Sequence, residues 1–395
     1  MSPLDLANYA GREQAYVKHF LLEKYLRDWG YKVGSEWDAL VYIDGFAGPW
    51  GVKDPKCADS SFGVATETLR EIAAGLRAHK NRTLATRSIL VEKSPKAFAE
   101  LSAFADAKRK LGDDVVALSG EFDTKIAEIK QLSADTGKSP FKFILLDPKG
   151  WKDIPMEALR PLLNDRSCEV LVNLMTSDIA RFVEQDDRAN SYNALFGRTG
   201  VLDILRQIPK GTGEAAECAV REYCKSLKQL CSFKYVSQAV ILEPNAEAIR
   251  YFLIYATNHH RGVEVFKSAE MKAAKIQDDA RSEAKLRKTK QPEFSFDDEF
   301  NRTAVVHNLR AKYVARARSK IREMMRTAHN SRISYRNLFC EAMAFPLVTR
   351  NDLNEWLTEL FPAIAIELDA QNRRAPSLDH EDFVVVKQSS LIPRE

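Results

Sequence analysis

Metal-binding and redox motifs are missing from this 395-residue chain. Its six cysteines include no Cys-x-x-Cys pair and no Cys/His cluster. Cys218, Cys224 and Cys231 follow one another at intervals of six and seven residues, a spacing that fits no zinc-binding template. We therefore expect reduced structural thiols, as in a cytoplasmic protein, and no bound metal.

Long apolar runs are also missing. No stretch reaches the roughly 20 apolar residues that a membrane-spanning helix needs, and Met1 to Gly11 lack the apolar segment of a signal peptide. We expect no membrane partner. An apolar content of 45% is ordinary for a globular protein, and 395 residues suffice for a large domain with a smaller one.

Acidic residues stand at the ends of short apolar runs. Three such runs occupy residues 41–44, 88–92 and 141–147 and end in Asp44, Glu92 and Asp147. Strands that are apolar on both faces are typical of a parallel sheet covered by helices. Ligands of such sheets bind beyond the carboxyl ends of the strands. The pattern predicts a nucleotide-like ligand held by its ribose and amino groups.

Strands and helices alternate over the first two thirds of the chain. Strands are predicted at 39–44, 88–92, 115–118, 142–147 and 169–175. Two further strands, 235–242 and 250–256, are separated by a short turn, which indicates an antiparallel pair. This content predicts an α/β fold with the Rossmann-like sheet of a class I methyltransferase, whose last strand is antiparallel, over residues 1–268.

The glycine turn after the first strand discriminates between two cofactors. NAD carries a pyrophosphate, which needs Gly-x-Gly-x-x-Gly opening directly into a helix. Here Gly45 and Gly48 are three residues apart, and a loop of about a dozen residues follows. Asp44 suits the cationic methionine end of S-adenosylmethionine and repels a phosphate. S-adenosylmethionine is therefore the predicted cofactor, although a glycine turn can also serve tight packing alone.

Each part of that cofactor has a predicted contact. Glu92 would hold the ribose, the turn that begins at Asp44 would hold the methionine end, and Asp123 or Glu121 would accept from the adenine amino group. The predicted cofactor-binding residues are Asp44, Gly45, Phe46, Ala47, Gly48, Glu92, Glu121 and Asp123.

Asp147 and Pro148 stand where base-modifying amino-methyltransferases carry Asp/Asn-Pro-Pro-aromatic. In those enzymes a carboxylate or amide accepts from the target amino group, and the aromatic ring stacks on a flipped base. Trp151 lies one place later than that pattern requires. We predict that Asp147 is the acceptor and that Pro148 and Trp151 shape the pocket; the alternative is a simple strand-ending turn. Asn173 could orient this turn or only bond a neighbouring backbone.

Basic residues concentrate near residues 298–327, which read as one long helix. Between positions 301 and 336 the chain has ten Lys or Arg residues and one acid, a net charge of +9. A stripe of one sign repels itself, and phosphates would relieve that repulsion. A solvated helix face is the alternative. The predicted nucleic-acid contacts are Lys312, Arg316, Arg318, Lys320, Arg322 and Arg326.

Short helices and two strands follow the basic helix. The strands, near 364–367 and 383–387, flank a charged loop at 372–374. Helices followed by such a hairpin are typical of a winged helix, which binds nucleic acid or, alternatively, protein. We predict a basic-helix and winged-helix domain over 298–395, joined to the first domain by a charged helix or linker over 269–297.

Six segments together resemble the three-Cys-motif partner protein family. They are Tyr42-Ile-Asp-Gly-Phe-Ala-Gly-Pro49, Asp59-Ser-Ser-Phe-Gly63, Ile89-Leu-Val-Glu92, Phe143-Ile-Leu-Leu-Asp-Pro148, Val170-Leu-Val-Asn173 and Tyr255-Ala-Thr-Asn-His-His-Arg-Gly262. The resemblance spans about residues 12–390. It implies a prokaryotic methyltransferase-like protein with a C-terminal winged helix, a radical-enzyme-like partner that carries the three cysteines, and a phage-defence or mobile-element context.

Two residues depart from the pattern of that family. Trp50 stands where its turn has a final glycine, and Lys149 stands where it has a phenylalanine. The predicted function is S-adenosylmethionine-dependent methylation of a nucleic acid, at a base nitrogen. The alternative is a catalytically silent methyltransferase fold that serves as a nucleic-acid-binding adaptor for a partner enzyme.

Overall fold

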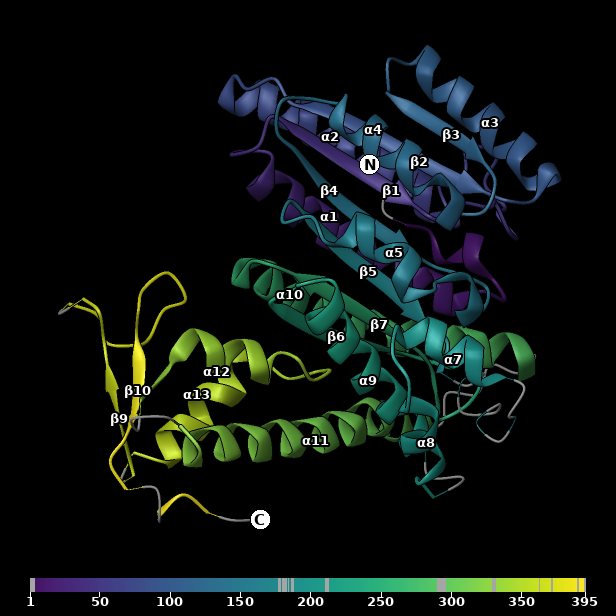
Figure 1. The fold of residues 1–395 in the computed structure, drawn as a ribbon. Helices are drawn as coiled ribbons and strands as arrows, with labels where there is room; N and C mark the ends of the chain where they lie inside the picture. The colour runs from purple at the N-terminus through teal and green to yellow at the C-terminus, as the bar shows by residue number, and fades with distance from the viewer. Residues whose placement is uncertain are drawn as a thin grey trace.

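A mixed seven-stranded sheet forms the centre of the computed structural model (Figure 1). The structure describes residues 4–393 except 177–178, 180–182, 184, 186–187, 210–212, 290–295, 329–331, 362, 371 and 389–390. The strands are β1 (Ala39–Asp44), β2 (Ala85–Glu92), β3 (Val115–Ser119), β4 (Pro140–Leu146), β5 (Cys168–Leu174), β6 (Tyr235–Leu242) and β7 (Ile249–Thr257).

The strand order is β3-β2-β1-β4-β5-β7-β6, with β7 antiparallel to both of its neighbours. This order confirms the predicted Rossmann-like methyltransferase sheet with a reversed last strand. The direction of strand order changes between β1 and β4, and ligands of open α/β sheets bind beyond the strand ends at such a point.

Helices cover both faces of the sheet. Leu40 and Tyr42 of β1 pack on one face with α1 (Glu13–Val33), α2 (Ser61–Lys80), α3 (Pro95–Lys110) and α10 (His260–Thr289). Val41 and Ile43 pack on the other, because side chains alternate along a strand. That second face is covered by α4 (Ile126–Ala134), α5 (Met156–Leu163), α7 (Ala189–Phe196), α8 (Val201–Arg206) and α9 (Glu214–Leu230).

Local signals explain where several helices begin. The Ser60 side chain accepts a hydrogen bond from the Gly63 backbone and caps α2. Proline is tolerated in the first turn, and Pro95 begins α3. Helix α10 continues far beyond residue 268, and the buried Ala269, Ala273 and Ala280 pack with α1. The charged helix or linker predicted over 269–297 is thus, up to Thr289, a continuation of α10 that packs on the first domain, and residues 290–295 lie outside the described part.

The C-terminal region has its own small sheet. Helix α11 (Phe296–Arg326) leads to β8 (Arg332–Ser334), α12 (Tyr335–Ala342), α13 (Arg350–Glu359), β9 (Ile364–Glu367) and β10 (Phe383–Val386). The antiparallel order is β8-β10-β9. Figure 1 shows this sheet, in yellow, beyond one end of α11 and apart from the large sheet. Among the helices that the structure describes, none is long and apolar enough to cross a membrane.

Candidate functional site

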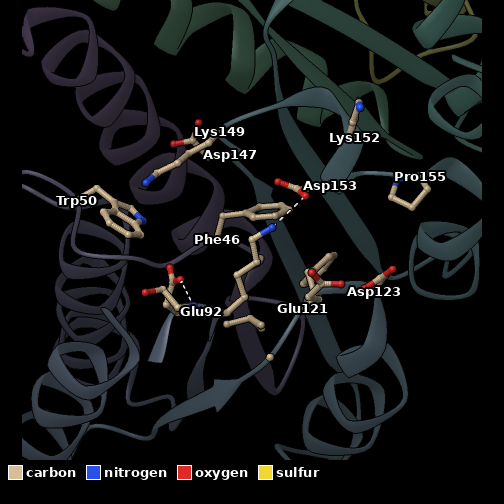
Figure 2. A pocket seen from close by; sticks show the side chains of 16 residues that line it. Phe46, Trp50, Glu92, Glu121, Asp123, Asp147, Lys149, Lys152, Asp153 and Pro155 are labelled. Carbon is tan, nitrogen blue, oxygen red and sulfur yellow. Dashed lines mark hydrogen bonds and ion pairs between the residues drawn. The ribbon is translucent and has the colours of Figure 1, made fainter. Parts of the chain in front are cut away.

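A cavity of about 330 Å³ lies at the carboxyl ends of β1, β2 and β4, where the strand order changes direction. This volume is at the lower end of the range of small-molecule sites, about 300–1,000 Å³. Figure 2 shows Trp50 and Glu92 on one side of the cavity and Glu121 and Asp123 on the other. The predicted residues that line it are Gly45, Phe46, Glu92, Glu121, Asp123 and Asp147.

Glu92 ends β2 and lines the cavity although only 5% of the residue is exposed. Its Oε1 accepts a hydrogen bond of 2.6 Å from the Ser94 backbone, which leaves Oε2 to bind a ligand hydroxyl. Oε2 lies beside Gly48, where a Cβ atom would overlap both that oxygen and the indole nitrogen of Trp50. Gly48 does not itself line the cavity, but only glycine permits this close approach.

Asp44 ends β1 as predicted, but its side chain does not face the cavity. Its carboxylate is fully buried, does not line the cavity, and accepts hydrogen bonds from the Tyr42 hydroxyl (2.9 Å), the Ser61 hydroxyl (2.7 Å) and the Phe46 backbone (3.1 Å). Burial raises the pKa of Asp44 to about 6, against the effect of these hydrogen bonds. Ala47 is also buried, and its N–H donates to the β2 backbone, so neither residue reaches a ligand in the cavity.

Asp147 follows β4 and lines the cavity between two buried partners. Asn173 Nδ2 donates to Oδ1 at 2.6 Å, and Lys18 Nζ forms an ion pair with Oδ2. This hydrogen bond agrees with the first of the two roles considered for Asn173, orientation of the turn at Asp147. Sequence reasoning missed Lys18, which lies on α1 and is 8% exposed. The sequence offered one signal for a buried Lys18. It stands three residues before the apolar Leu21, and residues three or four apart share a helix face.

Trp151 and Pro148 are buried and do not line the cavity. The Trp151 ring packs on Tyr192 of α7, with ring centroids 4.9 Å apart, and is the buried residue of the short helix η3 (Trp151–Asp153), whose Lys152 and Asp153 line the cavity. Neither Trp151 nor Pro148 therefore shapes this cavity directly, in contrast to the prediction.

Trp50 supplies the aromatic ring at the rim instead. It is 50% exposed, and Lys149 Nζ lies 3.1 Å from its ring centroid in a cation–π contact. The two residues that depart from the family pattern thus contact each other, as Figure 2 shows. On another side of the cavity Lys93 Nζ pairs with Asp153 at 3.1 Å, and this hydrogen bond raises the pKa of Lys93.

The predicted nucleic-acid contacts on α11 are largely engaged with acids. Lys312 and Arg316 both pair with Glu217 of α9, and Arg318 pairs with Glu359 of α13. Lys320 pairs with Glu323 within α11, while Arg322 and Arg326 are half-buried. The net charge of +9 counted over residues 301–336 therefore overstates the charge that this region presents, because Glu217 and Glu359 from other elements neutralise part of it.

All six cysteines are free, and five are buried. Burial raises the pKa of the Cys224, Cys231 and Cys340 thiols to about 12, so these groups are inert thiols. Within the described residues, no three His, Cys, Asp or Glu side chains are grouped so that they could hold a metal ion.

No family model matches this chain, and no curated protein sequence matches it. Solved structures with some likeness include the O-methyltransferase from Bacillus cereus in complex with SAH, at 12% identity and a TM-score of 0.34, covering 65% of this chain and 93% of the other.

A putative caffeoyl-CoA O-methyltransferase from Staphylococcus aureus has 11% identity and a TM-score of 0.28, covering 58% of this chain and 82% of the other. A putative O-methyltransferase from Klebsiella pneumoniae has 9% identity and a TM-score of 0.29, covering 62% of this chain and 90% of the other. Matches at these TM-scores assign neither substrate nor ligand. The resemblance to the three-Cys-motif partner family stays a prediction.

Proposed function

We propose that this protein is an S-adenosylmethionine-dependent methyltransferase that acts on a base nitrogen of a nucleic acid. One observation carries the proposal: Glu92, which ends β2, and Asp147, which follows β4, line one cavity at the point where the strand order changes direction. The strand order itself is that of the predicted methyltransferase sheet.

The charges around the cavity favour this cofactor over a dinucleotide. The lining includes three lysines and five acids, namely Lys93, Lys149, Lys152, Glu92, Glu121, Asp123, Asp147 and Asp153. An excess of carboxylates attracts a sulfonium and an ammonium group and repels a pyrophosphate. Glu92 would hold the ribose hydroxyls, and Glu121 or Asp123 would accept from the adenine amino group. Bound there, the cofactor would supply an electrophilic methyl group.

Asp147 would orient the acceptor. Each of its oxygens takes one hydrogen bond, from Lys18 or Asn173, and an ionised carboxylate has about four acceptor sites, so capacity remains for an amino group. Asn173 Oδ1 is buried beside Asp147 without a hydrogen-bond partner among the described residues and offers a second acceptor. The exposed ring of Trp50 would stack on a base at the rim in place of Trp151.

The C-terminal region would hold the nucleic acid. The order α11-β8-α12-α13-β9-β10, with the sheet order β8-β10-β9, supports the assignment of a winged helix. Two features support instead the second candidate, a catalytically silent adaptor for a partner enzyme. The exposed face of α13 carries Glu355 and Glu359, which oppose a phosphate backbone, and four of the six predicted contacts on α11 have acidic partners.

Calorimetry with S-adenosylmethionine, SAH and NAD tests the cofactor first. The protein should bind the first two and not NAD, and ligand at a hundredfold its Kd should stabilise the fold by about 2.7 kcal/mol. Glu92→Ala should abolish binding, while Glu100→Ala, an exposed acid on α3, should not. Absence of binding by the folded protein contradicts the proposal.

Transfer of a labelled methyl group to DNA, RNA or protein separates the two candidates. The enzyme should label a nucleic acid, and Asp147→Asn should reduce the rate by at least about a hundredfold, because a positioned hydrogen-bonding group commonly contributes that much. Glu128→Gln, an exposed acid on α4, serves as the control. If cofactor binds and no substrate is labelled even with the partner protein present, the adaptor is the correct function.

A further inference from the structure

A second cavity, of about 820 Å³, lies at the opposite end of the strands from the first. The first residues of β4 and β5 line it, together with the end of α1 and the segment that joins β7 to α10. Because β4 rises about 3.3 Å per residue, its seven residues separate the two cavities by roughly 20 Å. Nothing in the proposed methyl transfer uses this second cavity.

Aromatic side chains form part of its wall. Trp37 meets Phe141 edge to face, with ring centroids 5.1 Å apart and an interplanar angle of 76°. Trp29 packs on the same Phe141, with centroids 6.0 Å apart. All three residues line the cavity. Such rings offer a face on which a flat heterocycle can stack.

Cations without acidic partners also face the cavity. Lys32, Lys80 and Arg166 line it, and among the described residues none of the three forms an ion pair; Lys80 Nζ donates to the Ser35 hydroxyl at 2.8 Å. Arg261, by contrast, is already paired with two carboxylates. Glu36 is the exposed acid of the lining. Three cations without acidic partners against one exposed acid, Glu36, and one buried acid, Glu169, favour an anionic ligand.

The floor of the cavity is polar but internally satisfied. Glu169 is 3% exposed and accepts hydrogen bonds from the Tyr25 and Thr257 hydroxyls. Burial raises the pKa of Glu169, so this carboxyl repels an anionic ligand less than an exposed acid would. Gly262 closes over this group: a Cβ there would overlap the Tyr255 hydroxyl and lie 2.7 Å from Glu169 Oε1. The segment that joins β7 to α10 contributes Asn258, His259, Arg261 and Gly262 to the lining and thus forms one side of a ligand-sized space.

We propose that this second cavity binds a nucleoside phosphate, with its base stacked on Trp37 and Phe141 and its phosphate held by Lys32, Lys80 and Arg166. The combination of flat aromatic walls and unpaired cations matches a ligand that is both aromatic and anionic. The volume accommodates one nucleotide with room to spare. The ligand is either a free nucleotide or the 5′-terminal nucleotide of a single strand, which share this chemistry.

Calorimetric titration of the full-length protein with four probes tests the proposal: AMP, adenosine, inorganic phosphate and a 5′-phosphorylated single-stranded tetranucleotide. AMP should bind, and adenosine and phosphate should each bind at least about tenfold more weakly, because each lacks one half of the recognised chemistry. Arg166→Glu, at an exposed position, should weaken AMP binding about tenfold, and Trp37→Leu should weaken it by a similar factor.

Two control variants locate the bound ligand. Lys110→Glu changes an exposed cation at the end of α3 and should leave the Kd for AMP unchanged. Glu92→Gln alters the first cavity and should leave it unchanged as well. Because the two cavities are tested by different variants, failure here is distinguishable from failure of the methyltransferase proposal.

The outcomes divide clearly. Binding of AMP with the stated dependence on Arg166 and Trp37 supports a free nucleotide as the ligand, and the same dependence with the tetranucleotide alone supports a nucleic-acid end. Absence of binding of all four probes to the folded protein overturns the proposal. So does AMP binding that survives Arg166→Glu and Trp37→Leu but is lost in Glu92→Gln, because the ligand would then occupy the first cavity.

Discussion

The buried carboxylate of Asp44 gives the stability of this protein a definite pH dependence. Its pKa rises from the ordinary value of 3.8 to about 6, because burial disfavours the charged form. Between these values the native state holds more protons than the unfolded state, so the free energy of unfolding falls as pH rises through this window. The rise corresponds to about 3 kcal/mol of stability lost between roughly pH 4 and pH 7.

Asp44→Asn should remove that loss. Asparagine keeps an acceptor for the Phe46 backbone, and its amide can donate to the Tyr42 or Ser61 hydroxyl, so the hydrogen bonds have replacements. Urea denaturation from pH 4 to pH 8 gives the free energy of unfolding of each protein. The variant minus wild-type difference should grow by about 3 kcal/mol from pH 4 to pH 7 and stay constant above.

Ser61→Ala tests the same argument in the opposite direction. The Ser61 hydroxyl donates to the charged carboxylate at 2.7 Å and lowers its pKa, so its loss should raise the pKa further. The total decline in stability with pH should then be larger than in the wild type and should extend to a higher pH. Parallel pH curves for wild type and Asp44→Asn would refute the reasoning, because the carboxylate would then not be desolvated in the native state.

Two further substitutions test other buried contacts. Lys18→Met leaves the Asp147 carboxylate, 20% exposed, without its cation and should lower the free energy of unfolding by about 2–3 kcal/mol. The double variant Lys18→Met/Asp147→Asn should lose less stability than the sum of the losses of the two single variants. Additive losses would contradict an energetic coupling between Lys18 and Asp147. Gly262→Ala should cost about 1–3 kcal/mol in urea denaturation by overpacking. Its control, Gly150→Ala, has no atom within 4 Å of the new Cβ and should change stability by less than about 0.5 kcal/mol. Equal losses of stability in the two variants would contradict a steric overlap at Gly262.

The sheet, and a cavity beyond the ends of its strands, could be predicted from the sequence. Buried strands are short apolar runs, and an antiparallel pair needs only a short turn between two such runs, so both signals are local. The side chains at the ends of β2 and β4 reach one cavity because parallel strands bring their carboxyl ends to one edge. Glu92 and Asp147 were therefore located by backbone direction alone.

Tertiary structure decided which side chains face that cavity and what they contact. Asp44 precedes the same glycine turn, yet two hydroxyls hold its carboxylate in the core. Trp50 reaches the rim while Trp151 is buried. Side-chain direction depends on contacts between elements, which no local pattern encodes.

Charge is the clearest case of this difference. The basic stretch of α11 was visible in the sequence, but Glu217 lies 95 and 99 residues away from Lys312 and Arg316, and Glu359 lies 41 residues away from Arg318. The ion pair between Lys18 and Asp147 spans 129 residues. A sequence determines the charges that a chain carries, whereas only the folded arrangement determines which of them remain uncompensated, because electrostatic attraction acts through space rather than along the chain.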